Sequence, residues 1–198
     1  MNIKGSKTEQ NLLKTFAGES RARNKYTFYA EKAKEEGFEF IAAIFYETAE
    51  NEKAHARRVF NDFLKDNKTT AENLLNAAMG EAYESEKMYK EFEKTARQEG
   101  FEEIANFYKE LAETEEYHKE RFKAILENLK DGKIFKRNIK VKWHCRNCGY
   151  IHEDYEAPER CPLCNFPKSY FEIYCENFKE GVNLWKNAWL LGFHMIFY

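Results

Sequence analysis

The chain has 198 residues, of which 33% are charged and 43% hydrophobic, and its formal net charge is −2. This length suits one full domain plus a small one, and the near-neutral charge favours neither nucleic acid nor a membrane as a partner. The first residues contain no apolar stretch typical of a secretory signal, so we expect a cytoplasmic protein.

Four helices are predicted in the first two thirds of the chain. Residues 1–130 contain no proline, as long uninterrupted helices require, and apolar residues recur there at helical spacing. Thr69 and Glu72 are spaced as a capping box at the start of the third helix. The expected helices and their breaks are 7–36, Gly37, 38–65, a turn at 66–68, 69–99, Gly100 and 101–130.

The two halves of this helical region repeat. Residues 35–42 match residues 98–105, and the same shift along the chain places Glu52 on Glu115 and His55 on His118. A glutamate and a histidine three residues apart lie on one helix face, where both side chains can hold one metal ion. A repeated Glu-x-x-His pair therefore predicts a helical bundle with a two-fold metal site.

The other two helices supply further carboxylates at similar depth. The interval from Glu19 to Gly37 is only one residue shorter than the interval from Glu81 to Gly100. The neighbours of both glutamates are mostly small or apolar, a setting in which an unpaired carboxylate is costly. Glu84 follows one turn after Glu81 without a counterpart in the first half, so one metal is expected to have more carboxylates around it. Oxygen ligands with two imidazoles favour iron or manganese.

Several residues near these pairs have two interpretations. A single Glu-x-x-His is more often a solvated surface, but two pairs in register with helix-mate glutamates favour a metal site. Tyr26 and Tyr89 lie two turns beyond the first and third glutamates, so their hydroxyls either reach the edge of the site or belong to ordinary core aromatics. Glu50, Glu113 and Glu116 are expected to be charges on the outer faces.

A cysteine module follows the helices. Two Cys-x-x-Cys pairs separated by twelve residues predict a tetrahedral four-thiolate metal site formed by Cys145, Cys148, Cys161 and Cys164. Zinc ribbons share this spacing; zinc would be structural, whereas iron would carry single electrons. Neighbouring aromatic residues favour iron because they limit solvent access; they are Trp143, Tyr150, Tyr155, Phe166, Tyr170 and Phe171. Cys175 is left over as a buried or free thiol.

Together these motifs resemble the rubrerythrin family over roughly residues 7–178. The resemblance rests on Gly18-Glu19-Ser20, Tyr26, Glu52-Lys53-Ala54-His55, Gly80-Glu81, Glu84, Glu115-x-x-His118, Cys145-Arg146-Asn147-Cys148-Gly149 and Cys161-Pro162-x-Cys164. It implies an all-α, four-helix ferritin-like bundle followed by a small β-rich rubredoxin-like domain. The expected boundaries are 1–132 for the bundle, 133–142 for a linker, 143–178 for the cysteine domain and 179–198 for an apolar tail.

The resemblance also implies an activity. It indicates a non-haem di-iron peroxidase that reduces hydrogen peroxide to water, with electrons passing from NADH through a separate reductase or rubredoxin to the four-cysteine iron and then to the di-iron site. Two irons are expected in the bundle and one in the cysteine site, although zinc can replace iron in either. The implied bundle ligands are Glu19, Glu52, His55, Glu81, Glu84, Glu115 and His118, with Tyr26 and Tyr89 as further catalytic candidates.

A ferroxidase or iron-binding protein of the ferritin type is the alternative. The cysteine module favours the peroxidase, because an electron carrier is useful to a reductase and superfluous for iron storage. The implied partners are hydrogen peroxide, an electron-donor protein and a second copy of the chain. The tail at 179–198 is interpreted as a packing helix, an interfacial anchor or an extension without function, and packing or no function is favoured over a membrane role.

The short turn at 66–68 predicts an assembly between chains. If the two-fold axis of the repeat runs across the bundle, the third helix must begin at the opposite end from where the second one finishes. With helical arms of about 13 residues on either side of the site, that gap is roughly 40 Å. Three extended residues span about 10 Å. The bundle is therefore either a simple up-and-down series or a domain-swapped dimer, and the crossed arrangement of ferritin-like sites favours the dimer.

Overall fold

A computed structural model describes residues 3–176, so the apolar tail at 179–198 lies outside the described residues. The chain divides into two compact units, one ending at Phe122 and the other beginning at Lys123. The first unit is helical and the second holds a small sheet, which confirms the predicted fold class of a helical bundle followed by a β-rich metal domain.

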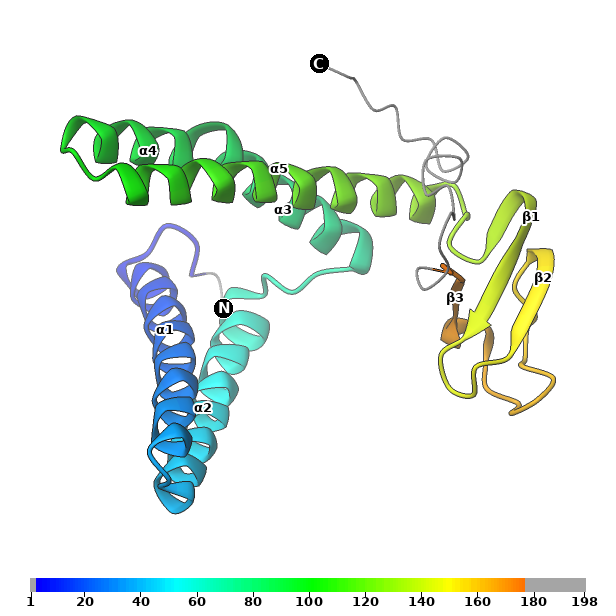
Figure 1. Ribbon diagram of the computed structural model, residues 1–198, viewed down its shortest axis with the longest axis horizontal. Coiled ribbons are helices and arrows are strands. Elements are labelled where there is room, and N and C mark those ends of the chain that lie inside the picture. Colours follow the sequence, from blue (N-terminus) through cyan, green and yellow to red (C-terminus); the bar gives the residue numbers. More distant parts are fainter. Residues whose placement is uncertain (1–2, 177–198) are drawn as a thin grey trace. The chain divides into compact units, whose positions relative to one another are not determined.

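The first helical hairpin follows the prediction closely. Helix α1 (Lys7–Glu35) and helix α2 (Glu39–Arg58) lie side by side, and the last turn of the second helix widens into the π-helix η1 (Val59–Leu64) (Figure 1). Gly37 takes the left-handed conformation, with φ of 83°, that ends a helix without a steric penalty. The amide of Phe38 donates to the carbonyl of Ala33 at 2.8 Å and closes the turn.

The second hairpin repeats this design with one interruption. The predicted helix at 69–99 is continuous but contains a π-turn, so it divides into α3 (Thr70–Tyr83), η2 (Glu84–Met88) and α4 (Tyr89–Gln98). Gly100, again at φ 83°, leads into α5 (Glu102–Lys130). The capping box at the start of α3 is confirmed, because the amides of Thr69 and Glu72 are each hydrogen-bonded to the other's side chain.

Alanines line the contact between helices. Ala33, Ala42, Ala96, Ala105 and Ala112, which include two pairs at equivalent positions of the repeat, are all at most 8% exposed. Small side chains let two helices approach closely, and the larger apolar side chains are left on other faces. Many of these are 40% exposed or more. An extended set of exposed large apolar side chains is informative, because it marks a surface that another element is expected to cover.

The second unit contains an antiparallel three-stranded sheet in the order β2-β1-β3. Its strands are β1 (Lys136–Cys145), β2 (Ile151–Glu156) and β3 (Phe171–Ile173). The segment expected to be a linker, 133–142, contains the first seven residues of β1. Trp143 is fully buried, packs with Cys145 and Phe171, and its indole N–H donates to the carbonyl of Asp154 at 3.0 Å.

Within residues 3–176, no helix combines the length and the apolar character needed to cross a membrane.

Candidate metal centres

Each helical hairpin gathers two glutamates and one histidine. Within each group the ligand atoms all lie within 4.8 Å of one another. The first group is Glu19 on α1 with Glu52 and His55 on α2, and the second is Glu81 on α3 with Glu115 and His118 on α5. The structure thus brings six of the predicted bundle ligands together as two half-sites of three, which we call the first and second half-site.

The two half-sites have similar internal geometry. His55 Nδ1 lies 3.0 Å from the Glu52 carboxylate and 3.5 Å from that of Glu19. In the second half-site the corresponding distances from His118 Nδ1 are 2.7 Å to the Glu115 carboxylate and 4.0 Å to the Glu81 carboxylate. Two carboxylates this close to one another need a shared proton or a cation between them.

The pKa values of the glutamates in the two half-sites reflect the same crowding of carboxylates. A hydrogen bond with Glu52, together with burial and the repulsion between the two carboxylates, raises the pKa of Glu19, and this bond lowers the pKa of Glu52. Burial and the neighbouring carboxylate of Glu115 raise the pKa of Glu81. In each half-site the second carboxylate thus raises the proton affinity of the first, and a bound cation would relieve the same repulsion.

A π-turn makes the two halves unequal. Tyr26 follows Glu19 by seven residues, whereas Tyr89 follows Glu81 by eight, and η2 lies within the longer interval. A π-turn holds one more residue than an α-turn, so η2 absorbs the additional residue without turning Tyr89 off the face of Glu81. The aromatic packing beside each half-site is accordingly the same. Tyr26 stacks on Phe45 with ring centroids 6.3 Å apart, and Tyr89 stacks on Tyr108 at 6.0 Å.

Glu84 begins the π-turn and lies beside the second half-site. Burial raises the pKa of Tyr89, and the charge of Glu84 with a hydrogen bond between the two side chains raises it further. Glu84 also contributes to the raised pKa of Glu81. It stands outside the group whose ligand atoms lie within 4.8 Å of one another. The corresponding position in the first hairpin is Ala22, so this additional carboxylate distinguishes the two half-sites.

A buried lysine behind the second half-site was not predicted from the sequence. The Lys119 side chain is only 7% exposed, and its ammonium donates to Glu86 at 3.0 Å and to Glu116 at 2.7 Å. Ser85 in the π-turn donates to the carbonyl of Glu81 at 2.7 Å and lies 3.3 Å from the Glu116 carboxylate. The network ties α5 to the π-turn through Glu116, whose side chain is 49% exposed. The equivalent of Lys119 in the first half is Ala56, so the repeat gave no signal for it.

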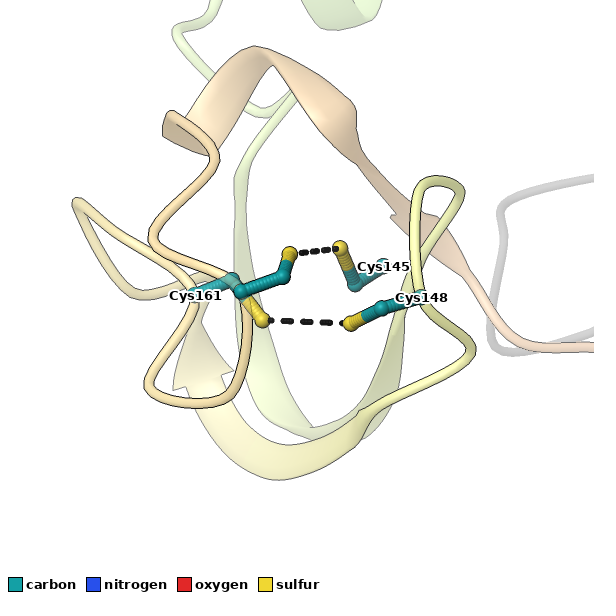
Figure 2. Close-up of side chains that lie close together, drawn as sticks. Cys145, Cys148 and Cys161 are labelled. Carbon is teal, nitrogen blue, oxygen red and sulfur yellow. Dashed lines mark hydrogen bonds between the residues drawn. The ribbon is translucent and has the colours of Figure 1, made fainter.

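The four predicted cysteines converge in the second unit. Their sulfur atoms all lie within 4.8 Å of one another, with 3.7 Å between Cys145 and Cys164 and 3.6 Å between Cys148 and Cys161. Figure 2 shows the sulfurs of Cys145, Cys148 and Cys161 pointing into one space between two loops. Each Cys-x-x-Cys loop closes with a backbone hydrogen bond to the carbonyl of its first cysteine, so the two loops are equivalent knuckles.

The surroundings of Cys148 and Cys164 shift the pKa values of these two thiols in opposite directions. Burial acts to raise the pKa of Cys164, but hydrogen bonds from the Asn147 side chain and the Phe166 amide outweigh it and lower that pKa to about 6. The amide of Tyr150 acts to lower the pKa of Cys148, yet burial and the neighbouring thiols raise it to about 12. The protein alone thus favours the thiolate form of Cys164 and disfavours that of Cys148. Cys175 is free and exposed.

Comparisons with known proteins agree with both centres. The family model described as rubrerythrin matches residues 10–126, and the model described as the rubrerythrin rubredoxin-like domain matches residues 143–172. The rubrerythrin of Porphyromonas gingivalis is 46% identical over 89% of this chain and 94% of its own length. The rubrerythrin of Nitratidesulfovibrio vulgaris is 44% identical over 87% of this chain and 96% of its own length. A putative rubrerythrin of Methanocaldococcus jannaschii is 40% identical over 89% of this chain and 97% of its own length.

Proposed function

Because the chain belongs to the rubrerythrin family, whose members are generally peroxide-detoxifying di-iron proteins, we propose that it reduces hydrogen peroxide to water with electrons that originate in NADH. The observation that carries this proposal is the presence, in one chain, of two matched Glu-Glu-His half-sites and a four-thiol centre. A two-electron reaction site and a one-electron carrier are the two components that such a reductase needs.

The donor sets fit iron. We assign two irons in the bundle and one in the cysteine centre, because carboxylate oxygens with imidazoles suit non-haem iron and four thiolates suit a rubredoxin-type iron. When bound, the bundle irons supply the two electrons that cleavage of the O–O bond consumes, and the cysteine-bound iron replaces them one at a time. The proposed ligands are Glu19, Glu52, His55, Glu81, Glu84, Glu115 and His118 in the bundle and Cys145, Cys148, Cys161 and Cys164 in the cysteine centre.

Side chains beside the half-sites can supply the protons that the reaction consumes. Reduction of hydrogen peroxide to two waters consumes two protons as well as two electrons. At the edge of the second half-site the Glu84 carboxylate raises the pKa of the Tyr89 hydroxyl through its charge and a hydrogen-bonding interaction. We assign Tyr89 the role of holding this carboxylate in place and of supplying a proton beside it. Tyr26 lies at the matching position of the first half-site, where no carboxylate corresponds to Glu84.

Tyr89→Phe is expected to lower peroxide turnover by about tenfold, because a hydrogen bond to a charged carboxylate is lost. Iron content is expected to stay at the wild-type level, because no proposed ligand is removed. Tyr26→Phe is the matched comparison and is expected to have the smaller effect. Anaerobic peroxide consumption and iron per chain measure both variants, and equal losses in the two would contradict a special role for Tyr89.

A visible spectrum tests the whole proposal. Iron-reconstituted full-length protein should show a red ferric-thiolate absorption that bleaches under anaerobic conditions with NADH and a rubredoxin-reducing protein. Addition of hydrogen peroxide should restore the colour, with one peroxide consumed for every two electrons. If the colour did not return, while the protein still oxidised added Fe(II) with dioxygen or hydrogen peroxide as the electron acceptor, the ferroxidase alternative would be the better description.

The partners and the location follow from the same chemistry. The proposed partners are hydrogen peroxide, a rubredoxin or NADH-dependent reductase that docks near the cysteine centre, and at least one further copy of the chain. All five cysteines are free, as suits a reducing compartment, and we therefore assign the protein to the cytoplasm.

A further inference from the structure

Lys119 is a buried charge that the proposed peroxide chemistry does not use. Its side chain is 7% exposed, although an ammonium taken out of water is costly unless it is paired and hydrogen-bonded. It donates to Glu86 at 3.0 Å and to Glu116 at 2.7 Å, and a carboxylate oxygen of Glu120 lies 3.7 Å away. The preceding residue on α5 is the proposed ligand His118. An ammonium buried beside a proposed ligand points to a role in that half-site.

The bonds of Lys119 lead to the π-turn that carries Glu84. Glu86 lies within η2, and Ser85, the residue before it, lies 3.3 Å from the Glu116 carboxylate that Lys119 also binds. Ser85 is only 2% exposed, so its contact with α5 is shielded from solvent. The two residues that directly follow Glu84 are therefore both fastened to the same pair of side chains on α5.

A π-turn depends on such contacts, because it is a rare departure from the α-helix. At the end of η2 the amide of Tyr89 donates to the carbonyl of Glu84, five residues earlier instead of the usual four. The additional residue that widens the helix fits equally into neighbouring turns. A wide turn moved towards the N-terminus would rotate Glu84 by part of a turn about the helix axis. Contacts from outside the helix therefore decide where the wide turn lies.

The first hairpin serves as an internal comparison. Ala56 occupies the position that matches Lys119, and it has no ammonium to donate. Lys53 matches Glu116 and pairs instead with Glu50 on its own helix at 2.9 Å. Helix α1, which corresponds to α3, η2 and α4 together, contains no π-turn. The buried ammonium thus occurs in the hairpin whose first helix has the wide turn, and the other hairpin has an alanine at that position.

We propose that Lys119 is a positioning residue of the second half-site. Its ammonium holds the π-turn against α5 and thereby fixes the place of the Glu84 carboxylate. Lys119 acts through Glu84 and touches none of the reacting atoms. This inference rests on the proposed function, because Glu84 is a proposed ligand of the bundle iron.

Lys119→Met tests the proposal, because methionine keeps an unbranched apolar stem and removes the ammonium. The carboxylates that lose their partner remain solvated, since the side chains of Glu86 and Glu116 are 55% and 49% exposed. The variant is therefore expected to fold and to bind iron in both centres. Peroxide turnover is expected to fall by about tenfold, which is in the range that loss of an outer partner of a metal site costs.

Mössbauer spectroscopy of the full-length chain reports the position of Glu84 without any turnover. The oxidised wild type, loaded with the Mössbauer-active iron isotope, should give two distinct signals of equal area for the bundle irons, because only the second half-site has this additional carboxylate. Glu84→Ala supplies the reference in which the difference between the two signals is smallest. Lys119→Met should shift both signals towards that reference, and a wild-type spectrum for Lys119→Met would overturn the proposal.

Lys109→Met is the matched control. Lys109 lies on the same helix, its side chain is 54% exposed, and it pairs with Glu113 at 3.6 Å. Exposed ion pairs contribute little, so this variant should equal the wild type in spectrum and turnover. In a double variant with Glu84→Ala, Lys119→Met should cause no further loss of turnover, because the two residues act as one unit. Losses that multiply in the double variant would mean that Lys119 acts by another route, against the proposal.

Glu86→Ala removes the other end of the same bond from a half-exposed position, and it decides the outcome if Lys119→Met fails to fold. It should shift the bundle-iron signals in the same direction. In both iron-loaded variants, hydrogen exchange followed by mass spectrometry should show the amides of residues 85–89 exchanging at least about tenfold faster than in the wild type, since hydrogen bonds to charged groups contribute at least that much. Unchanged exchange and an unchanged spectrum in Glu86→Ala would contradict the positioning role.

Failure of the proposed function would give a different pattern of results. A wild type that consumes no peroxide would remove that function, while the spectra and the exchange rates would still show whether Lys119 positions the π-turn. A wild type with full turnover, together with an unchanged spectrum of Lys119→Met, would remove only the positioning role.

Discussion

Glu52→Ala is expected to abolish bundle iron binding and to lower peroxide turnover by at least about 100-fold. Loss of a residue that only hydrogen-bonds to a metal ligand already lowers metal affinity or activity by about 10–100-fold, and loss of a ligand itself should cost at least as much. Glu52 lies 3.0 Å from His55 Nδ1 and shares a hydrogen bond with Glu19. Alanine removes the carboxylate that links the other two members of the first half-site, and it also removes charge repulsion, so the metal-free helices should remain folded. Iron analysis, circular dichroism and anaerobic peroxide consumption measure these effects.

Glu50→Ala is the matched control for this prediction. Glu50 lies on the same helix two residues away, is exposed, and its carboxylate pairs with Lys53 at 2.9 Å. Exposed ion pairs of this kind contribute little to stability, so iron content and turnover should equal those of the wild type. Loss of iron in both variants would show that helix α2 is sensitive to charge in general. Retention of iron by Glu52→Ala would remove this residue from the ligand set.

Cys161→Ser is expected to eliminate the red absorption and to stop NADH-driven turnover. Cys161 is 2% exposed, and its sulfur lies 3.6 Å from that of Cys148. A serine hydroxyl at that position is a poor replacement for a thiolate ligand, and metal binding contributes to the folding of small cysteine domains. A chemically reduced Cys161→Ser protein should still consume peroxide in a single turnover, because the bundle ligands are intact.

The prediction is specific because NADH-driven turnover should be lost while the single-turnover reaction of the chemically reduced protein is kept. Cys175→Ser replaces an exposed free thiol in the same unit and should leave the spectrum and the NADH-driven rate unchanged. Full NADH-driven turnover by Cys161→Ser would mean that electrons reach the bundle without the cysteine centre. Loss of the single-turnover reaction as well would mean that the substitution disturbs the bundle, and helical circular dichroism would detect that.

Local and repeated features of the fold were predictable from the sequence. The helices follow from the spacing of apolar residues, from the absence of proline and from the two glycines that separate the helices of each hairpin. The capping box of Thr69 with Glu72 was confirmed. The two half-sites were predictable because the internal repeat pairs each Glu-x-x-His with its copy. The four-thiol centre was equally evident, since two Cys-x-x-Cys pairs have few alternative uses in a reducing compartment.

Features that depend on a changed helical period or on distant neighbours were missed. The π-turn η2 was not predicted, because reading a sequence at 3.6 residues per turn assumes a constant period. Its trace was nevertheless present in the spacing, since the interval from Glu81 to Gly100 is one residue longer than the interval from Glu19 to Gly37. The burial of Lys119 had no such trace, because it depends on Glu86, which lies 33 residues away in the chain.

The additional residue of the π-turn ends the equivalence of the two hairpins. Both hairpins have matching glycines, matching Glu-Glu-His groups and matching stacked aromatic rings. The second hairpin has one more residue between its glutamate and its tyrosine, and this residue accounts for η2 and for the position that Glu84 occupies. Without it, both metal positions would have the same surroundings. One residue in a helix therefore gives the two metal positions different chemical identities.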